Sequence, residues 1–125
     1  MSKKWVTVLL VVFVLMFALS ACGSLKDVSK LGDKFMSALK TQDNETSYAM
    51  LSPDIQYEVG YEAGWAEWTS IRAFNDWKFT SKSVENNLAT LEGTAHLDGE
   101  EYLVTLAFTR NGDAWEITTI IFELP

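Results

Sequence analysis

The chain is 125 residues long and 48% hydrophobic, a size that allows one domain with its own apolar core. Eight of its ten Lys and Arg and all 17 Asp and Glu follow Cys22, so the part of the chain after that residue carries a formal charge of −9. This excess of carboxylates argues against nucleic acid as a partner and against a polybasic contact with anionic lipid, because both need clustered Lys and Arg.

The first 21 residues have the layout of an export signal. A short basic segment, Met1 to Lys4, precedes an almost unbroken apolar stretch from Trp5 to Ala18, and Leu19-Ser20-Ala21-Cys22 follows. The apolar run of about 14 residues is short for a membrane-spanning helix, which needs about 20. The sequence therefore predicts a signal peptide over residues 1–21, cleaved between Ala21 and Cys22.

Leu19 to Cys22 resembles the bacterial lipobox, in which the Cys receives a diacylglyceryl group on sulfur and becomes the first residue of the mature protein. Cys22 is the only thiol of the chain, and a thiolate is the nucleophile that this transfer needs. Two or three palmitate-type chains would hold a protein at a membrane essentially permanently. We therefore expect an extracytoplasmic lipoprotein of the cell envelope, with residues 22–24 as its lipidated tether; a spare Cys behind a transmembrane helix is the alternative.

Residues 25–125 predict a single α+β domain whose helices come first. Apolar side chains recur at steps of three and four from Leu25 to Leu39, which is the buried face of an amphipathic helix. A short helix from about Glu45 to Leu51 follows. Ser52-Pro53-Asp54 then supplies an N-cap, a first-turn proline and an acidic first turn for a third helix.

The third helix is expected over residues 54–74, weakened by Gly60 and Gly64. Four large side chains fall on one stripe of it: Tyr61, Trp65, Trp68 and Ile71. After residue 76 the apolar period changes from that of a helix to the alternation of strands. Helices are therefore expected to precede a sheet.

Two turns set the expected register of this sheet. Asp98-Gly99 and Asn111-Gly112 are both two-residue type I′ hairpin signals between alternating segments. If both turns form, Leu106 lies opposite Leu91 on one neighbouring strand and opposite Ile117 on the other. The same register places Tyr102 and Thr119 on the inner face, and it leaves an apolar spot on the polar outer face, formed by Leu103 and Ile120.

Residues 76–84 are expected to join this sheet as a fourth strand. A three-residue connection, Glu85-Asn86-Asn87, directs Trp77 and Phe79 toward the core, whereas a two-residue turn would bury the lysines of the strand. The expected architecture is N-terminal helices packed on a curved, antiparallel, four-stranded meander.

This order of elements resembles the nuclear-transport-factor-2-like, or cystatin-like, cone. More closely, the chain resembles small bacterial lipoproteins of unknown function on that fold, through Phe35 to Lys40, Asp43, Tyr48 to Pro53 and Asn111 to Ile117. The resemblance implies a cone that opens between the helices and the concave sheet face. Relatives bind small apolar molecules there, or act as isomerases, cyclases or dehydratases with an Asp or His base and a Tyr-type acid.

Six residues are candidates for a pocket at the mouth of such a cone: Tyr61, Trp65, Trp68, Arg72, Tyr102 and Thr119. They combine apolar walls with few polar groups, as small-molecule sites do. The alternative is a core stripe of aromatic side chains, with Glu58, Glu62 and Arg72 in solvent. No Asp or His lies beside Tyr102 and Thr119 in the expected register, which disfavours catalysis.

The remaining polar residues predict no metal, cofactor or catalytic residue. His96 is the only histidine, and its position opposite Glu101 indicates a surface cross-strand pair. One His and one Cys cannot form a zinc site or a nucleophile–histidine pair. We therefore expect a non-enzymatic domain that binds a small apolar ligand or a protein, with a homodimer through Leu103 and Ile120 as one form of contact. An isomerase or dehydratase that uses the cone cavity is the alternative.

Overall fold

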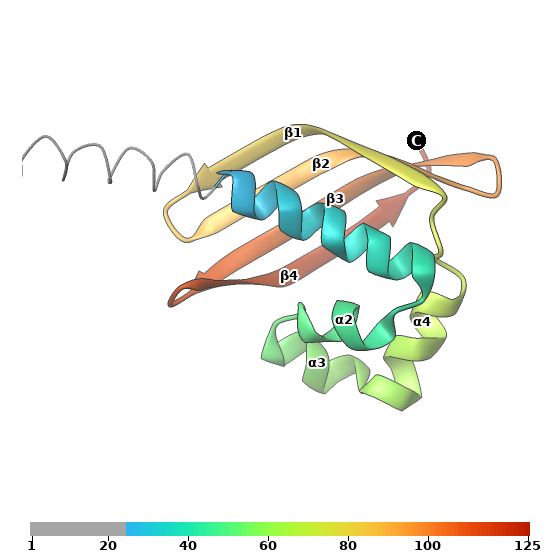
Figure 1. Cartoon of the computed structure of the whole chain (residues 1–125), viewed down its shortest axis with the longest axis horizontal. Coiled ribbons are helices and arrows are strands. Elements are labelled where there is room, and N and C mark those ends of the chain that lie inside the picture. The colour runs from blue at the N-terminus through green and yellow to red at the C-terminus, as the bar shows by residue number, and fades with distance from the viewer. Residues whose placement is uncertain (1–24) are drawn as a thin grey trace, which may run out of the picture.

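The computed structural model describes residues 25–125, so the predicted signal peptide, the Ala21–Cys22 cleavage site and the tether lie outside the described residues. Within the described part, a long helix over residues 25–41 is followed by short helices and then by four strands (Figure 1). The predicted α+β class, with helices packed on an open antiparallel meander, is confirmed. In this range no helix has the length and apolar character needed to span a membrane.

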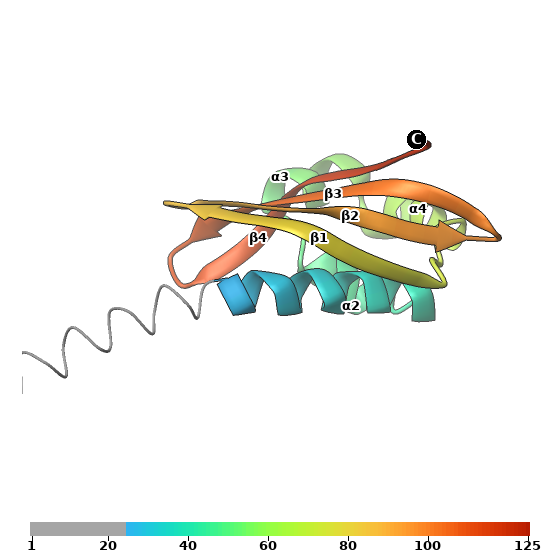
Figure 2. The ribbon, with the colours of Figure 1, turned by 90° about the horizontal axis from the view of Figure 1, so that it is seen from above.

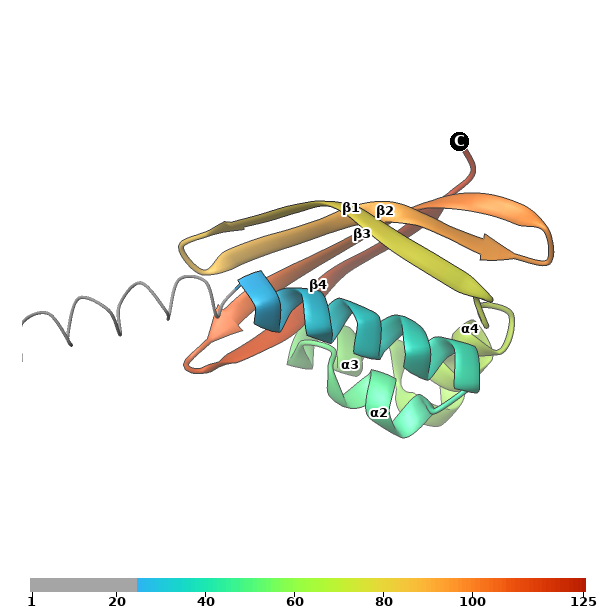
Figure 3. The same cartoon turned by 45° about the horizontal axis from the view of Figure 1, so that its top comes forward.

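The long helix lies along one face of the sheet (Figures 2 and 3). The predicted apolar side chains Val28, Phe35 and Leu39 are buried there. Gly32 allows a close approach between the helix and the sheet, because a Cβ at this position would lie 2.3 Å from Cδ1 of Leu91. The helix therefore forms one wall of the core.

The second helix, α2 (Asn44–Ala49), is shorter than expected. Asp43 caps it, and its carboxylate accepts the backbone N–H of Thr46. Leu51 lies beyond the helix and forms a parallel bridge with Ile117. Pairing with the sheet edge competes with helical hydrogen bonding, so the helix ends before Leu51, its expected last residue.

The expected third helix is divided into α3 (Pro53–Val59), a π-helical turn η1 (Tyr61–Trp65) and α4 (Ala66–Ser70). Gly60 causes the division, because it has a φ of +63° and its carbonyl accepts the N–H groups of both Gly64 and Trp65. The wider turn rotates the residues that follow. Ile71, expected on the buried stripe, is 68% exposed because α4 ends at Ser70 and Ile71 is no longer helical.

The four strands form a sheet in sequence order, with all neighbours antiparallel: β1 (Asp76–Glu85), β2 (Leu88–Leu97), β3 (Glu100–Asn111) and β4 (Ala114–Glu123). The predicted Asp98-Gly99 turn is confirmed, with positive φ at both residues. Leu91 lies opposite Leu106, as this turn requires.

The predicted three-residue connection between β1 and β2 is wrong. The strands join through a two-residue turn, Asn86-Asn87, and a bulge at Thr80 then shifts the register by one residue. Because of this bulge, Trp77 and Phe79 still lie on the inner face and pack against the core. Lys82 lies opposite Leu91 but remains exposed.

The predicted register of the β3–β4 hairpin is also wrong. Its turn is Gly112-Asp113, since Asn111 extends β3 and pairs with Ala114. Only Gly112 has a positive φ, 66°, which is the requirement of a type II′ rather than a type I′ turn. A bulge at Thr118 adds a further shift of one residue.

The turn shift moves the pairing by two residues and keeps the predicted faces, whereas the bulge exchanges the faces of the second half of β4. Ile120 and Phe122 lie opposite Leu106 and Val104 and pack against the core. Thr119 lies opposite Ala107, so it is not the inner-face residue that the sequence predicted. Bulges of this kind have no local sequence signature, and the expected register contained none.

The space between the helices and the sheet is filled by large side chains. The largest of the fully buried residues are Trp65, Phe35, Phe74 and Phe108. Trp65 comes from η1, Phe35 from the long helix and Phe108 from β3. The core is thus shared by every layer of the domain.

Candidate functional site

A small open pocket of about 180 Å³ lies between the short helices and β4. We call it the helix–β4 pocket, and its walls come from α3, η1, α4 and β4: Ile55, Val59, Trp65, Trp68, Thr118, Thr119 and Ile120. Five of these seven side chains are apolar. The β4 bulge at Thr118 helps to form the pocket, because it brings three consecutive residues of the strand to its wall.

Two stacked tryptophans form the main wall of this pocket. The rings of Trp65 and Trp68 have centroids 4.9 Å apart and an interplanar angle of 15°. Trp65 is buried, and its indole Nε1–H donates a hydrogen bond of 3.0 Å to Oγ of Ser47. Trp68 is half-buried, and the guanidinium of Arg72 lies 4.2 Å from the centre of its ring. One ring is thus fixed by the core, and the other is accessible.

The aromatic contacts continue beyond the pocket in both directions. The ring of Tyr48 lies 6.5 Å from that of Trp65 and 5.1 Å from that of Tyr61. On the other side, Phe122 lies 5.9 Å from Trp68. Such tilted and edge-on pairs are favourable geometries for aromatic rings, so the pocket wall is held by a continuous set of contacts.

The structure brings three of the six predicted pocket residues together, because Trp65, Trp68 and Thr119 all line the helix–β4 pocket. Arg72 is not part of the pocket lining, and its Nη1 donates a hydrogen bond of 2.9 Å to the backbone carbonyl of Trp68. Tyr61 is 39% exposed and joins the pocket only through Tyr48. The π-helical turn explains its displacement.

Tyr102, the sixth predicted residue, packs edge-on against Phe74, 5.6 Å away, and does not line the pocket. Its hydroxyl donates to a carboxylate oxygen of Glu100 at 3.3 Å. Partial desolvation, followed by the negative charge of Glu100, raises the pKa of Tyr102. Desolvation lowers the pKa of Arg72, and the electrostatic effect of the nearby Tyr102 partly opposes this shift.

The helix–β4 pocket is lined by apolar side chains and hydroxyl groups. None of the side chains that line it is a carboxylate, an imidazole or an amine, and its polar groups are threonine hydroxyls. Asp54, Glu58 and Glu67, which are adjacent in sequence to residues of the lining, are exposed, and so is Glu62. General acid–base catalysis needs a titratable group within hydrogen-bonding reach of the substrate, and this lining provides none.

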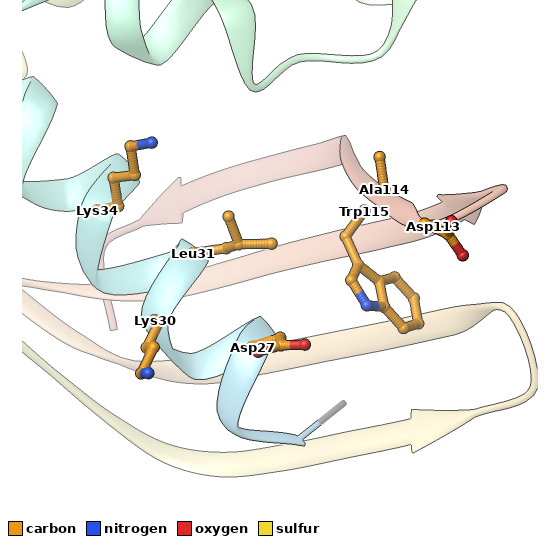
Figure 4. Close-up of a pocket in the computed structure, with 7 residues that line it drawn as sticks. All are labelled: Asp27, Lys30, Leu31, Lys34, Asp113, Ala114 and Trp115. Atoms are coloured by element: carbon orange, nitrogen blue, oxygen red, sulfur yellow. The ribbon is translucent and has the colours of Figure 1, made fainter. Parts of the chain in front are cut away.

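A second, larger groove of about 400 Å³ separates the long helix from the β3–β4 turn (Figure 4). Leu31 and Trp115 supply its apolar part. Its rim is charged on both sides of the groove: Asp27, Lys30, Lys34 and Asp113. The groove depends on how the helix crosses the sheet, which no local sequence pattern indicates; the alternation that directs Trp115 inward was the available signal.

His96 is a surface residue, as predicted, but its partner differs. Its Nδ1 lies 2.6 Å from Oδ1 of Asp76, with the two side chains 46% and 69% exposed. Glu101 is directly opposite His96 on β3, whereas Asp76 is opposite on β1. The contact therefore comes from β1, and the register expected from the sequence did not place a β1 residue beside His96.

The predicted apolar spot on the outer face has a different composition. Leu103 is 43% exposed there, but Ile120 points to the inner face. Ile121, 41% exposed, lies opposite Thr105 and takes its place beside Leu103. The β4 bulge accounts for this exchange.

Within residues 25–125, no three His, Cys, Asp or Glu side chains lie close enough together to hold a metal ion. Comparison with protein-family models and with curated proteins finds no match for the chain. The features that indicate a function are therefore the export-like order of residues 1–22 and the geometry of the pockets.

Proposed function

We propose that the chain is an extracytoplasmic lipoprotein of the bacterial cell envelope, anchored through Cys22, whose domain binds an apolar group in the helix–β4 pocket. The order basic segment, apolar run, Leu-Ser-Ala-Cys supports the anchor. The helices and open meander are compatible with the nuclear-transport-factor-2-like cone that the sequence resembles.

One observation carries the binding proposal: Trp65 and Trp68 stack at 4.9 Å beside an open pocket with no titratable side chain in its wall. Aromatic and aliphatic walls with a few hydroxyls favour apolar groups. The volume of about 180 Å³ is below the range of about 300–1,000 Å³ typical of drug-sized ligands. The occupant is therefore one apolar group of a larger molecule, or a very small ligand.

The proposed anchor also gives the domain an orientation. The start of the long helix, drawn in blue, lies at the same end of the domain as the β1–β2 and β3–β4 turns (Figure 1). That end also holds the groove with Trp115, Lys30 and Lys34. Tryptophan and lysine are frequent at membrane–water interfaces. This end would face the bilayer, and the helix–β4 pocket would remain accessible from the aqueous side.

A naphthalene-type fluorescent dye tests the pocket. We expect saturable binding to the domain 24–125, with energy transfer from tryptophan to the dye. The substitution Trp68→Ala should weaken binding by at least about tenfold, since it removes the accessible wall. Trp115→Phe, which alters only the second groove, is the matched control and should bind normally. Equal losses in both variants, or no saturable binding to the native domain, would contradict the proposal.

A further inference from the structure

One edge of the sheet has free backbone groups. β4 is an outer strand, and its outer side is paired at Ile117, whose N–H and C=O bond to Met50 and Ser52. Beyond this point, residues 119–123 make no backbone hydrogen bond to any described segment other than β3. Alternate residues of such a strand direct their N–H and C=O groups outward, ready for another strand.

The sequence of this edge is unprotected. Proteins usually guard outer strands with lysine, proline or bulges. β1, the opposite edge, carries Lys78, Lys82 and a bulge between them. In β4 the bulge lies at Thr118, in the middle of the strand, and the residues that follow, Thr-Ile-Ile-Phe, contain no charge or proline. β4 is therefore the edge suited to accept a strand.

The helix–β4 pocket opens beside the same edge, since residues 118–120 form one of its walls. Side chains of a strand alternate between its two faces. A strand added to β4 would direct one of its side chains toward Trp68 and Val59, and the pocket volume of about 180 Å³ suits a single apolar side chain. Backbone pairing and side-chain insertion can therefore occur together, as in other strand-addition sites.

The charges around this edge select the partner. Residues 43–67 carry six carboxylates, and there is no Lys or Arg between Lys40 and Arg72. Arg72 is itself occupied by its contact with Trp68. A basic segment would be attracted to these helices, whereas a second copy of this acidic chain would be repelled.

We propose that β4 residues 119–123 and the helix–β4 pocket bind an extended, basic segment of a partner protein as an added antiparallel strand, with one apolar side chain in the pocket. This inference rests on the proposed function, because it uses the same pocket. It adds the class of partner and the backbone contact that a small ligand would not make.

A synthetic peptide in which Lys alternates with Val around a central Leu tests this inference. The native full-length chain, reconstituted in phosphatidylcholine vesicles, is mixed with the peptide, and amide hydrogen exchange is followed. We expect alternate amides of residues 119–123 to exchange at least about tenfold more slowly, with no change in β1. Replacing every Lys of the peptide with Glu should abolish this protection, and a central Pro should weaken it.

The outcomes separate this inference from the proposed function. If the naphthalene dye binds but the Lys peptide leaves residues 119–123 unprotected, strand addition is wrong and the apolar pocket stands. If the Glu peptide protects β4 equally well, charge selection is wrong. Protection that increases with the density of the chain in the vesicles, without peptide, would show self-pairing of β4 and would overturn the proposed partner class.

Discussion

The indole N–H of Trp65 donates a hydrogen bond of 3.0 Å to Oγ of Ser47, and both side chains are buried. The bond joins η1 to α2 across 18 positions of the chain. It satisfies the one polar atom of the Trp65 ring, which would otherwise be buried without a partner. The inner wall of the helix–β4 pocket is therefore fixed before any ligand binds.

The substitution Ser47→Ala should lower the free energy of unfolding by about 1–3 kcal/mol, because it leaves the indole N–H unsatisfied. Urea unfolding followed by circular dichroism measures this change. Trp65→Phe removes the donor, so Ser47→Ala should cost clearly less in that background. Equal costs in the two backgrounds would show that the hydrogen bond contributes nothing.

The bulge at Thr118 places two adjacent isoleucines on opposite faces of the sheet. Ile120 packs against the core, whereas Ile121 is 41% exposed on the outer face. Ile120→Ala should therefore lower the free energy of unfolding by about 2 kcal/mol and Ile121→Ala by less than about 1 kcal/mol. The opposite order would support the register that the sequence predicted.

The sheet illustrates what a sequence can and cannot specify. Asp98-Gly99 was located correctly, because two adjacent residues that tolerate positive φ leave one way to form the turn. In Asn111-Gly112-Asp113, three consecutive residues all favour turns, and only the glycine needs positive φ, so the pattern allowed two positions. Bulges at Thr80 and Thr118 depend on packing between layers, which alternation alone does not reveal.

Gly93 lies where the backbone of β1 leaves no room for a side chain on β2. A Cβ at this position would lie 1.9 Å from the carbonyl oxygen of Lys78, which is backbone and cannot move aside easily. Gly93→Ala should lower the free energy of unfolding by about 1–3 kcal/mol, as overpacked sites do. Thr94→Ala, on the outer face of the same strand, should change it by less than about 0.5 kcal/mol. Thermal unfolding of both variants checks this, and an unaffected Gly93→Ala variant would contradict the close approach.

The stability of the domain should depend on the ionisation of Asp43 at acid pH. Its carboxylate accepts hydrogen bonds from the hydroxyl and then the backbone N–H of Thr46, and these lower its pKa below the ordinary value of 3.8. A lowered pKa in the folded state stabilises the fold above that value, and the contribution is lost as the pH falls through the folded pKa.

Asp43→Asn keeps a capping oxygen but cannot ionise. The variant should unfold at a lower temperature than the native domain near pH 7, and this difference should shrink as the pH falls to about 2. Calorimetry at several pH values measures it. A difference that stays constant with pH would mean that the charge of Asp43 does not stabilise α2.

The candidate pocket was only partly visible in the sequence. Trp65 and Trp68 were identified from their helical spacing, and this spacing holds because both residues lie at or after the end of η1. Tyr61 was placed on the same stripe because an α-helical period was assumed across Gly60 and Gly64, and Ile71 because the helix was expected to continue to residue 74, whereas it ends at Ser70. The π-helical turn changes that period, and Tyr61 lies outside the pocket as a result.

Attachment through Cys22 would determine the compartment and the orientation in which the helix–β4 pocket meets any partner. Intact mass spectrometry of the chain purified from its own bacterial membranes tests this directly. We predict a mature chain that begins at Cys22 and carries a diacylglyceryl group, and a Cys22→Ala variant that lacks both the lipid and the cleavage. A native chain that retains residues 1–21 and bears no fatty acid would contradict the proposed anchor.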